Sequence, residues 1–473
     1  MDAFPYILHT LTILLLIIIM IIFMVLAGGI GPNRLEGFDP YVQYGTVATV
    51  ILYALRFLTF IPIPQAIFNF LGIVCYNTHP PKPKLKTSTL FGPFICFRVV
   101  TRGTFPDLVK KNVQRNIDIC SRIGLDNYII EVVTDNAMNL PKSPRLREIV
   151  VPAQYTTTNH TRYKARALNY CLESGVNQLT DNDWIVHLDE ETLLTESSVI
   201  GIVNFINEGN YSFGQGVITY ANEEIVSWVT TLADLVRVGM DFGMIRFCLK
   251  YLHKPVFSWK GSFIVANAGV ERKITYDFGI EGSIAEDCFF GLTAWKDGYQ
   301  FGFVEGDMWE KSTFSIVDYI YQRKRWVQGI YNVFFSSQIP FKYKYGISLM
   351  LLSWFFMPFT VPNIILVPMF PLPMWRVVNI MCACMGAIML FLFIFGAIKS
   401  FSPRRAGWPK YIFLCFVPVV IVPVSMVLET IGVIVALKSR KMNSFHIVNK
   451  QTTVTTQTNV PRETSTANTV QHV

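Results

Sequence analysis

The chain has 473 residues, of which 51% are hydrophobic and only 16% are charged, and its mean hydropathy is +0.37. Soluble domains carry about 25% charged residues, so this composition excludes an ordinary soluble protein and indicates a membrane protein. The formal net charge is +8, and basic residues gather beside the apolar stretches rather than along an aromatic groove, which favours anionic lipid over nucleic acid as a partner.

The N-terminal 76 residues predict a membrane region with about two spans. Residues 7–27 are almost unbroken Leu, Ile, Met and Phe, and crossing a bilayer takes about 20 such residues. No positive charge precedes them, which favours a retained anchor over a cleaved signal peptide. A second span is predicted over 44–61, followed by an interfacial helix over 65–76.

Residues 77–89 are rich in proline and lysine and predict an extended linker. From 90 to 345 the sequence is that of an ordinary globular domain, in which β-rich runs alternate with runs of helical apolar spacing. The predicted strands are 94–100, 128–133 and 184–188, and the predicted helices are 107–123 and 162–173. Such alternation indicates an α/β domain with a parallel, right-handed sheet.

Residues 346–437 predict a second membrane region of two to three spans. The candidate spans are 347–370, 377–398 and 411–437, and residues 438–473 predict a polar, disordered tail. Three full spans would carry the basic residues after Leu437 to the side opposite the globular domain, against the positive-inside bias. The sequence leaves the span count open. Glu429 lies in the last span, where an acidic residue is expected to have a function or to lie at the interface.

The cysteines indicate the redox environment of the globular domain. Nine are scattered through the chain without a Cys-x-x-Cys pair or a zinc-like spacing. We interpret them as reduced thiols, which places the globular domain on the cytosolic side.

An acidic run closes the predicted strand 184–188. Ligands bind beyond the carboxyl ends of strands in α/β sheets, and Asp189 and Glu191 could point at one hard cation through oxygen. This is the arrangement of a divalent metal site that faces a diphosphate. The alternative is a solvated acidic loop, and the acids on their own do not decide between the two.

Other candidate residues follow in order. Asp135 closes the strand 128–133 and could accept hydrogen bonds from a nucleoside, whereas Lys164 could neutralise a phosphate. A strand-end acid and a helical lysine are each weak signals, since most such residues are simply solvated. Asp287 opens an apolar helical run and could act as a general base, although Asp is also a common helix cap.

A basic and aromatic cluster precedes the second membrane region. Arg325 can donate two parallel hydrogen bonds to a phosphate, and Trp326 offers a flat face to a sugar ring. The alternative is an interfacial helix that binds lipid headgroups.

Together these motifs resemble the inverting glycosyltransferases of family two, the group of cellulose, chitin and hyaluronan synthases. Within that family, residues 184–192 and 282–287 are most similar to the egghead-type β-1,4-mannosyltransferases of invertebrates. The motifs read Asp135, Lys164-Ala165-x-Ala167-Leu168-Asn169, Asp189-x-Glu191, Glu286-Asp287 and Gln322-x-x-Arg325-Trp326. Two positions depart from the family pattern: Glu191 stands where a second Asp is usual, and Ala285 where Thr is usual.

The resemblance implies a GT-A fold, a Rossmann-like nucleotide-sugar domain, held between transmembrane helices. It implies mannosyl transfer from GDP-mannose to glucosylceramide, with Asp287 as catalytic base and Mn²⁺ or Mg²⁺ held by Asp189 and Glu191. It also implies a multi-pass protein of the Golgi or endoplasmic reticulum with a cytosolic catalytic domain. The implied donor-binding residues are Thr101, Asp135, Lys164, Asn169, Asp189 and Arg325, and the implied acceptor-binding residues are Glu286, Gln322 and Trp326.

Three alternatives stay open at this point. The first two are a processive polysaccharide synthase and a transferase that acts on a polyprenyl phosphate, both from the same family. Polymerases usually have more spans than the five or so predicted here, and the polyprenyl-phosphate enzymes usually lack Gln-x-x-Arg-Trp. The third is a membrane scaffold with an inactive transferase-like domain, which the intact acids at Asp189, Glu191 and Asp287 disfavour.

Overall fold

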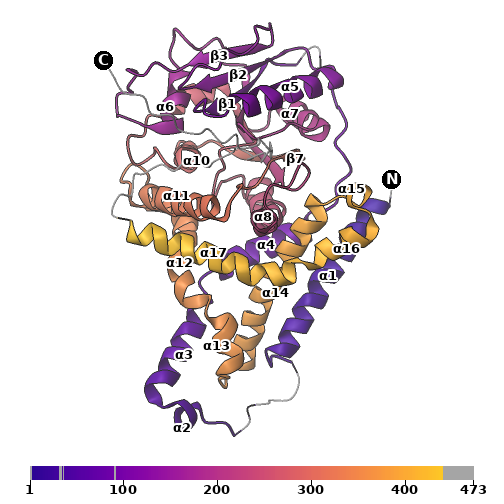
Figure 1. The fold of residues 1–473 in the computed structure, drawn as a ribbon, viewed down its shortest axis with the longest axis vertical. Coiled ribbons are helices and arrows are strands. Elements are labelled where there is room, and N and C mark those ends of the chain that lie inside the picture. The colour runs from indigo at the N-terminus through magenta and orange to yellow at the C-terminus, as the bar shows by residue number, and fades with distance from the viewer. Residues whose placement is uncertain (1–2, 31–34, 36, 90–91, 440–473) are drawn as a thin grey trace, which may run out of the picture.

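The computed structural model describes residues 3–30, 35, 37–89 and 92–439. An α/β domain occupies one end of the molecule, and long apolar helices extend from its base (Figure 1). The tail predicted after 437 falls, from residue 440 onward, outside the described residues. Both membrane regions lie at the same end of the domain, so the chain leaves that end and returns to it.

The first membrane region holds four helices. They are α1 (Phe4–Leu26), α2 (Pro40–Tyr44), α3 (Thr46–Leu58) and α4 (Ile63–Cys75). α1 is long and apolar enough to cross a bilayer, and α3 and α4 together form a second candidate span of 30 residues. Residues 65–76, which are expected from the sequence to form a separate interfacial helix, thus belong almost entirely to the same candidate span as α3. Pro62 and Pro64 permit this because they occupy the start of α4, where backbone N–H groups have no intrahelical partner.

Seven strands form one sheet in the order β3-β2-β1-β4-β6-β5-β7. Their bounds are β1 (Ile95–Thr101), β2 (Tyr128–Thr134), β3 (Leu146–Val150), β4 (Trp184–Asp189), β5 (Phe213–Thr219), β6 (Ile264–Asn267) and β7 (Phe301–Trp309). β1 pairs in parallel with β2 and β4, as the sequence predicts. The expectation of a wholly parallel sheet is wrong at β6, which runs antiparallel between β4 and β5. The carboxyl ends of β1, β2 and β4 share one edge of the sheet.

Helices cover both faces of the sheet and its base. They are α5 (Pro106–Ile123), α6 (Tyr163–Tyr170), α7 (Glu196–Glu208), α8 (Trp228–Met240), α9 (Ala268–Ile274), α10 (Glu286–Lys296) and α11 (Ile316–Phe335), with the π-helical turns η1 (Asp241–Ile245) and η2 (Cys248–Leu252) and the 3₁₀ turn η3 (Phe341–Tyr343). The predicted strands and helices of the first half are confirmed as β1, α5, β2, α6 and β4.

The second membrane region begins with a broken helix. Its elements are α12 (Tyr345–Thr360), α13 (Asn363–Met369), α14 (Arg376–Ser400), α15 (Pro403–Ala406), α16 (Trp408–Phe416) and α17 (Pro418–Lys438). α12 and α13 are bent by 47° at their junction. Within the described residues, four helices could each cross a membrane, or five spans if the bent pair counts as one. α17 runs across the base of the α/β domain beside α11, at a large angle to α1 and α3 (Figure 1).

The hydrophobic core is shared between the α/β domain and the membrane helices. One buried cluster joins strand residues such as Val186 and Val265 to Leu16 of α1, Ile73 of α4 and Phe391 of α14. Burying apolar area in one continuous cluster ties these elements into one folding unit. From the sequence, these residues are assigned to separate membrane and globular regions.

Two glycine contacts bring membrane helices against the domain at backbone distance. A Cβ placed on Gly396 of α14 would lie 2.0 Å from the Leu235 carbonyl oxygen of α8. A Cβ on Gly72 of α4 would lie 1.9 Å from the Gly243 carbonyl oxygen of η1. Only glycine fits at such approaches, so these positions fix the membrane helices against the domain.

Candidate active site

The acidic run lies where the sequence places it, at the carboxyl end of β4. Asp189 ends the strand, with its side chain 40% exposed. Glu190 turns toward the neighbouring strand and accepts a hydrogen bond from the Thr101 hydroxyl, while its carbonyl accepts one of 2.9 Å from Asn112. Asp189 and Glu191 both line the large cavity described below. The two carboxylates therefore share one edge of the sheet.

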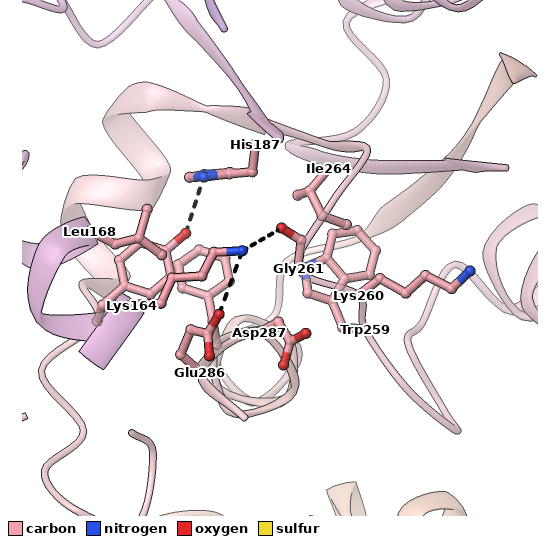
Figure 2. Close-up of a pocket in the computed structure, with 11 residues that line it drawn as sticks. Lys164, Leu168, His187, Trp259, Lys260, Gly261, Ile264, Glu286 and Asp287 are labelled. Atoms are coloured by element: carbon pink, nitrogen blue, oxygen red, sulfur yellow. Dashed lines mark hydrogen bonds and ion pairs between the residues drawn. The ribbon is translucent and has the colours of Figure 1, made fainter. Parts of the chain in front are cut away.

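Lys164 is held among carboxylates and is not solvated. Its Nζ lies 2.6 Å from Asp189 Oδ1. It also lies 3.8 Å from Glu286 Oε1 and donates a 3.0 Å hydrogen bond to the Gly261 carbonyl (Figure 2). Burial opposes the charge, but Asp189 and Glu286 outweigh it and raise the pKa of Lys164. The ammonium therefore stays charged and joins the β4 acids to those of α10.

Glu286 and Asp287 form the first turn of α10, so the helix begins at the site. Asp287 Oδ1 accepts a 2.7 Å hydrogen bond from the Cys288 N–H, which fixes the carboxylate. Burial raises the pKa of Asp287, and burial together with the Asp287 charge raises the pKa of Glu286 to about 7. A carboxylate with a raised pKa is a stronger base than an ordinary Asp.

Two close contacts fix the position of this acidic turn. A Cβ on Gly261 would lie 3.1 Å from Asp287 Oδ2 and 3.2 Å from Lys164 Nζ. A Cβ on Gly329 of α11 would lie 2.7 Å from the Ala285 Cβ. A side chain larger than glycine at 329 would meet Ala285, so Gly329 permits the close packing of α11 against the start of α10.

α11 carries the basic and aromatic motif. Arg323 is 3% exposed and lies 2.6 Å from Asp234 of α8 and 2.6 Å from Glu429 of α17. Its guanidinium lies 4.1 Å from the Trp326 ring centroid, and Arg237 approaches the same ring at 4.8 Å. These two contacts hold the Trp326 ring in place. Arg323, which the sequence motif leaves unspecified, is the buried centre of this cluster.

Glu310 is a site residue that the sequence analysis missed. It follows β7 directly, accepts a 2.6 Å hydrogen bond from Thr192 Oγ1, and lines the cavity. Burial, then the charges of Glu191 and Asp189, raise its pKa to about 7. The signal that could have revealed it is its place at a strand end, the criterion that identified Asp135 and Asp189.

One cavity of about 1620 Å³ brings most of the predicted residues together. Those that line it are Thr101, Asp135, Lys164, Asp189, Glu191, Glu286, Asp287, Gln322, Arg325 and Trp326. Asp135 lies at its rim, paired with Arg166 at 2.5 Å. Asn169 does not line it: its amide donates to the Tyr155 hydroxyl and its oxygen accepts from the Tyr276 N–H. Its contacts are those of a residue that braces α6.

The comparisons with known proteins agree with this geometry. A family model described as glycosyl transferase family group 2 matches residues 184–397. The β-1,4-mannosyltransferase egh of Drosophila melanogaster is 50% identical over 448 residues, which are 94% of this chain and 98% of the fly protein. This chain belongs to the egh and bre-3 family of β-1,4-mannosyltransferases. The Caenorhabditis elegans member, bre-3, is 47% identical over 413 residues, 87% of this chain and 90% of the nematode protein.

The egh and bre-3 family lies within glycosyltransferase family group 2, and the domain described above has the GT-A fold. Among solved structures, the chain is similar to the mannosyltransferase PcManGT from Pyrobaculum calidifontis in complex with GDP-Man and Mn²⁺, with a TM-score of 0.46 and 13% identity, covering 82% of this chain and all of that one. S. aureus TarS 1-349 gives a TM-score of 0.33 and 10% identity, covering 71% of this chain and 90% of TarS.

The donor set fits a divalent cation that is shared with a substrate. Across the described residues, no group of three or more His, Cys, Asp or Glu side chains could enclose an ion. Asp189, which ends β4, and Glu191, which follows it at the edge of the sheet, are two of the carboxylates that line the cavity. Mg²⁺ is usually bound by one or two carboxylates, with phosphate and water oxygens as its remaining ligands. A pair of acids therefore suits an ion that arrives with a nucleotide diphosphate.

Proposed function

We propose that this member of the egh and bre-3 family transfers mannose from GDP-mannose to the 4-hydroxyl of glucosylceramide, with inversion at the anomeric carbon. The observation that carries the proposal is the 50% identity to a β-1,4-mannosyltransferase over 94% of the chain. The cavity that joins Asp189 to Asp287 supports it, because it unites diphosphate-binding and base chemistry in one space.

On the donor side, Thr101 and Asp135 flank the guanosine at the ends of β1 and β2. Asp189 and Glu191 would hold Mn²⁺ or Mg²⁺, which when bound neutralises negative charge on the leaving diphosphate. Lys164 and Arg325 supply fixed positive charge to the same group. Lys164 must then exchange part of its contact with Asp189 for the phosphate oxygens, and its raised pKa keeps it cationic throughout.

Asp287 performs the proton transfer. The acceptor hydroxyl oxygen forms a bond to the anomeric carbon from the face opposite GDP, and the bond from that carbon to the phosphate oxygen breaks. The bonding electron pair leaves with GDP, and the hydroxyl proton passes to the Asp287 carboxylate. One displacement converts an α-linked donor into a β-linked product, which agrees with the β linkage in the names of the relatives.

The acceptor binds at the membrane side of the cavity. Trp326 stacks on the glucose ring, with Gln322 and Glu286 beside it. In this proposal the GT-A domain faces the cytosol, where GDP-mannose is made, in the Golgi or endoplasmic reticulum. The course of α17 across the base of the domain supports this topology (Figure 1). A helix in that position would keep Lys438 on the side of the domain, which agrees with the positive-inside bias.

To test the proposal, membranes that contain the full-length protein are incubated in parallel with GDP-mannose, UDP-glucose or UDP-N-acetylglucosamine. The lipids are then extracted. The expected result is a mannolipid, formed only from GDP-mannose, that is cleaved by endoglycoceramidase. Label confined to an insoluble polymer would contradict the proposal and favour a polysaccharide synthase. A labelled lipid that releases its sugar in mild acid and resists endoglycoceramidase would favour a polyprenyl-phosphate acceptor.

A further inference from the structure

The cavity that holds Asp287 continues far into the membrane region. Beyond Trp326 it is lined by α12, α14 and α17, with α3 and α4. On α14 the lining runs from Asn379 to Phe393. At 1.5 Å per residue this is about 21 Å along the helix, longer than one leaflet of a hydrocarbon core about 30 Å thick. We call this part of the cavity the membrane arm.

The lining of the membrane arm is mostly apolar and includes five adaptable methionines. Its methionines are Met350 and Met357 of α12, Met385 and Met389 of α14, and Met426 of α17. Methionine is unbranched and polarisable, and it is favoured on surfaces that bind apolar ligands of variable shape. Three separate helices contribute these residues, so they surround the arm on several sides. Such a lining suits flexible hydrocarbon better than a sugar polymer, which needs polar and flat aromatic partners.

The arm also contains one buried charged residue of α3. Arg56 of α3 is 9% exposed and lines the cavity, and its Nη1 lies 3.5 Å from Met374 Sδ. No carboxylate lies within ion-pair distance of Arg56 among the described residues. Hydrocarbon packed against a buried charge is unfavourable. Hydrocarbon in the arm is therefore expected to pack on the methionines and not against Arg56.

We propose that the membrane arm is the binding site for the hydrocarbon chains of the lipid acceptor, so that the enzyme draws its acceptor into the protein and does not act on a headgroup at the bilayer surface. The inference rests on the proposed function in one respect, that the acceptor is a membrane lipid. Its occupant follows from the continuity of the cavity: a headgroup at Asp287 and Trp326 has its chains directed into the arm.

The chain offers a matched pair of variants for the test. Met389 and Met381 lie on α14 and are 38% and 39% exposed, but only Met389 lines the arm. Met389→Trp fills the arm, whereas Met381→Trp adds the same bulk elsewhere on the helix. Each full-length variant is assayed with long-chain glucosylceramide and with a glucoside that carries a short alkyl chain.

The expected result is a decrease of about tenfold in kcat/KM for the long-chain acceptor with Met389→Trp, because overfilling an apolar site excludes its ligand. The short-chain glucoside and GDP-mannose affinity should be unchanged, and Met381→Trp should resemble the wild type with both acceptors. Equal effects of the two variants, or equal effects on the two acceptors, would overturn the proposal. Unchanged GDP-mannose affinity shows that the variant is folded.

A second measurement separates failure of this inference from failure of the proposed function. Glucosylceramide with a photoreactive group at its chain end is irradiated with the wild-type protein, and the labelled peptides are identified. Label on α12, α14 and α17 facing the arm is expected. If the protein transfers mannose to glucosylceramide but is labelled only on outward faces, the membrane arm is not the binding site, and the proposed function is unaffected. A protein that is labelled in the arm yet transfers no mannose refutes the function alone.

Discussion

Arg323 Nε of α11 donates a 2.6 Å hydrogen bond to Glu429 Oε1 of α17, so an acid inside the most C-terminal apolar helix is paired with the arginine that packs on Trp326. Tyr319 donates a second hydrogen bond, of 2.7 Å, to the same oxygen. The sequence analysis expected Glu429 to be functional or interfacial. Its observed partners make it the link between a membrane helix and the residue proposed to stack on the acceptor sugar.

Glu429→Gln should therefore weaken acceptor use more than donor use. The amide still accepts from Arg323 but removes the negative charge, so Asp234 is the one carboxylate left in the ion pairs given for Arg323, and Trp326 loses part of its support. A buried charge that loses one of two partners is costly. We expect kcat/KM for the acceptor to fall about tenfold, with GDP-mannose affinity unchanged. Thr430→Val, which alters the adjacent residue, is the control. Equal changes in donor and acceptor constants would show that Glu429 only stabilises the fold.

Asp287→Asn should abolish mannosyl transfer while GDP-mannose binding remains. Asparagine keeps the size of the side chain but cannot accept a proton, and general-base catalysis contributes about 100-fold or more. Calorimetric titration of GDP-mannose and a transfer assay, run on the same preparation, measure the two properties separately. Full transfer activity in this variant would remove Asp287 as the base.

The pH profile should show an acidic limb that lies above the ordinary Asp range. Burial raises the pKa of Asp287, and burial with the Asp287 charge raises that of Glu286 to about 7. The base Asp287 must be deprotonated to act, so its raised pKa means that activity is lost as pH decreases at a pH above the ordinary Asp range and is retained at higher pH. The profile of kcat/KM measures this limb. In Glu286→Gln one titrating group is lost, so the limb should be less steep; a limb in the ordinary Asp range would contradict the assignment.

Removal of divalent metal should abolish the transfer activity of the enzyme. With EDTA present, transfer by the wild type should fall to background and return on addition of Mn²⁺ or Mg²⁺, because Asp189 and Glu191 supply only part of a coordination shell. Glu191→Gln should raise the concentration of metal needed for half-maximal activity. Thr104→Ala, which changes a cavity-lining residue that is not a carboxylate, is the control. Undiminished activity without metal would refute the metal role of both acids.

A buried charge network behind the site should govern stability. Arg98 of β1 is 1% exposed and lies 2.9 Å from Glu131 and 3.3 Å from Glu271, and Glu271 lies 2.6 Å from His187. Arg98→Met leaves two buried carboxylates without this partner, which should destabilise the protein by about 3–5 kcal/mol. Exposed Arg102→Met should cost less than about 0.5 kcal/mol. Thermal unfolding of both variants in detergent measures the difference; equal shifts would show that the network is not stabilising.

Local patterns predicted the strands that carry the site. Trp184 to Leu188 is a buried apolar run with acids directly after it, and the structure confirms β4 with Asp189 at its end. The same reasoning missed Glu310, because the alternating sequence of β7 reads as a weaker strand signal than a continuous apolar run. It also predicted a parallel sheet, in which β6 proves to be antiparallel. Strand direction depends on how distant segments pair, and local periodicity does not encode that.

Residue roles that depend on packing could not be predicted from the sequence either. Asn169 belongs to a family motif, yet it braces Tyr155 and Tyr276 outside the cavity. Arg323 is an unspecified position of its motif, yet it is buried, at 3% exposure, in the cluster that holds Trp326. The partners that define these roles lie between 14 and 107 residues away along the chain. Spacing along the sequence therefore gave no signal for them.

The shared core has a consequence for how the protein is made. Phe391, Leu392 and Phe395 of α14 complete the hydrophobic cluster that also contains the strands of the GT-A domain. α14 is synthesised after every residue of that domain, so the ribosome must finish it, and the insertion machinery must deliver it to the bilayer, before the nascent domain can close its core. A premature stop just before α14 would thus disable the enzyme although every proposed catalytic residue had been translated, and the incomplete chain would present apolar surface to the quality-control system.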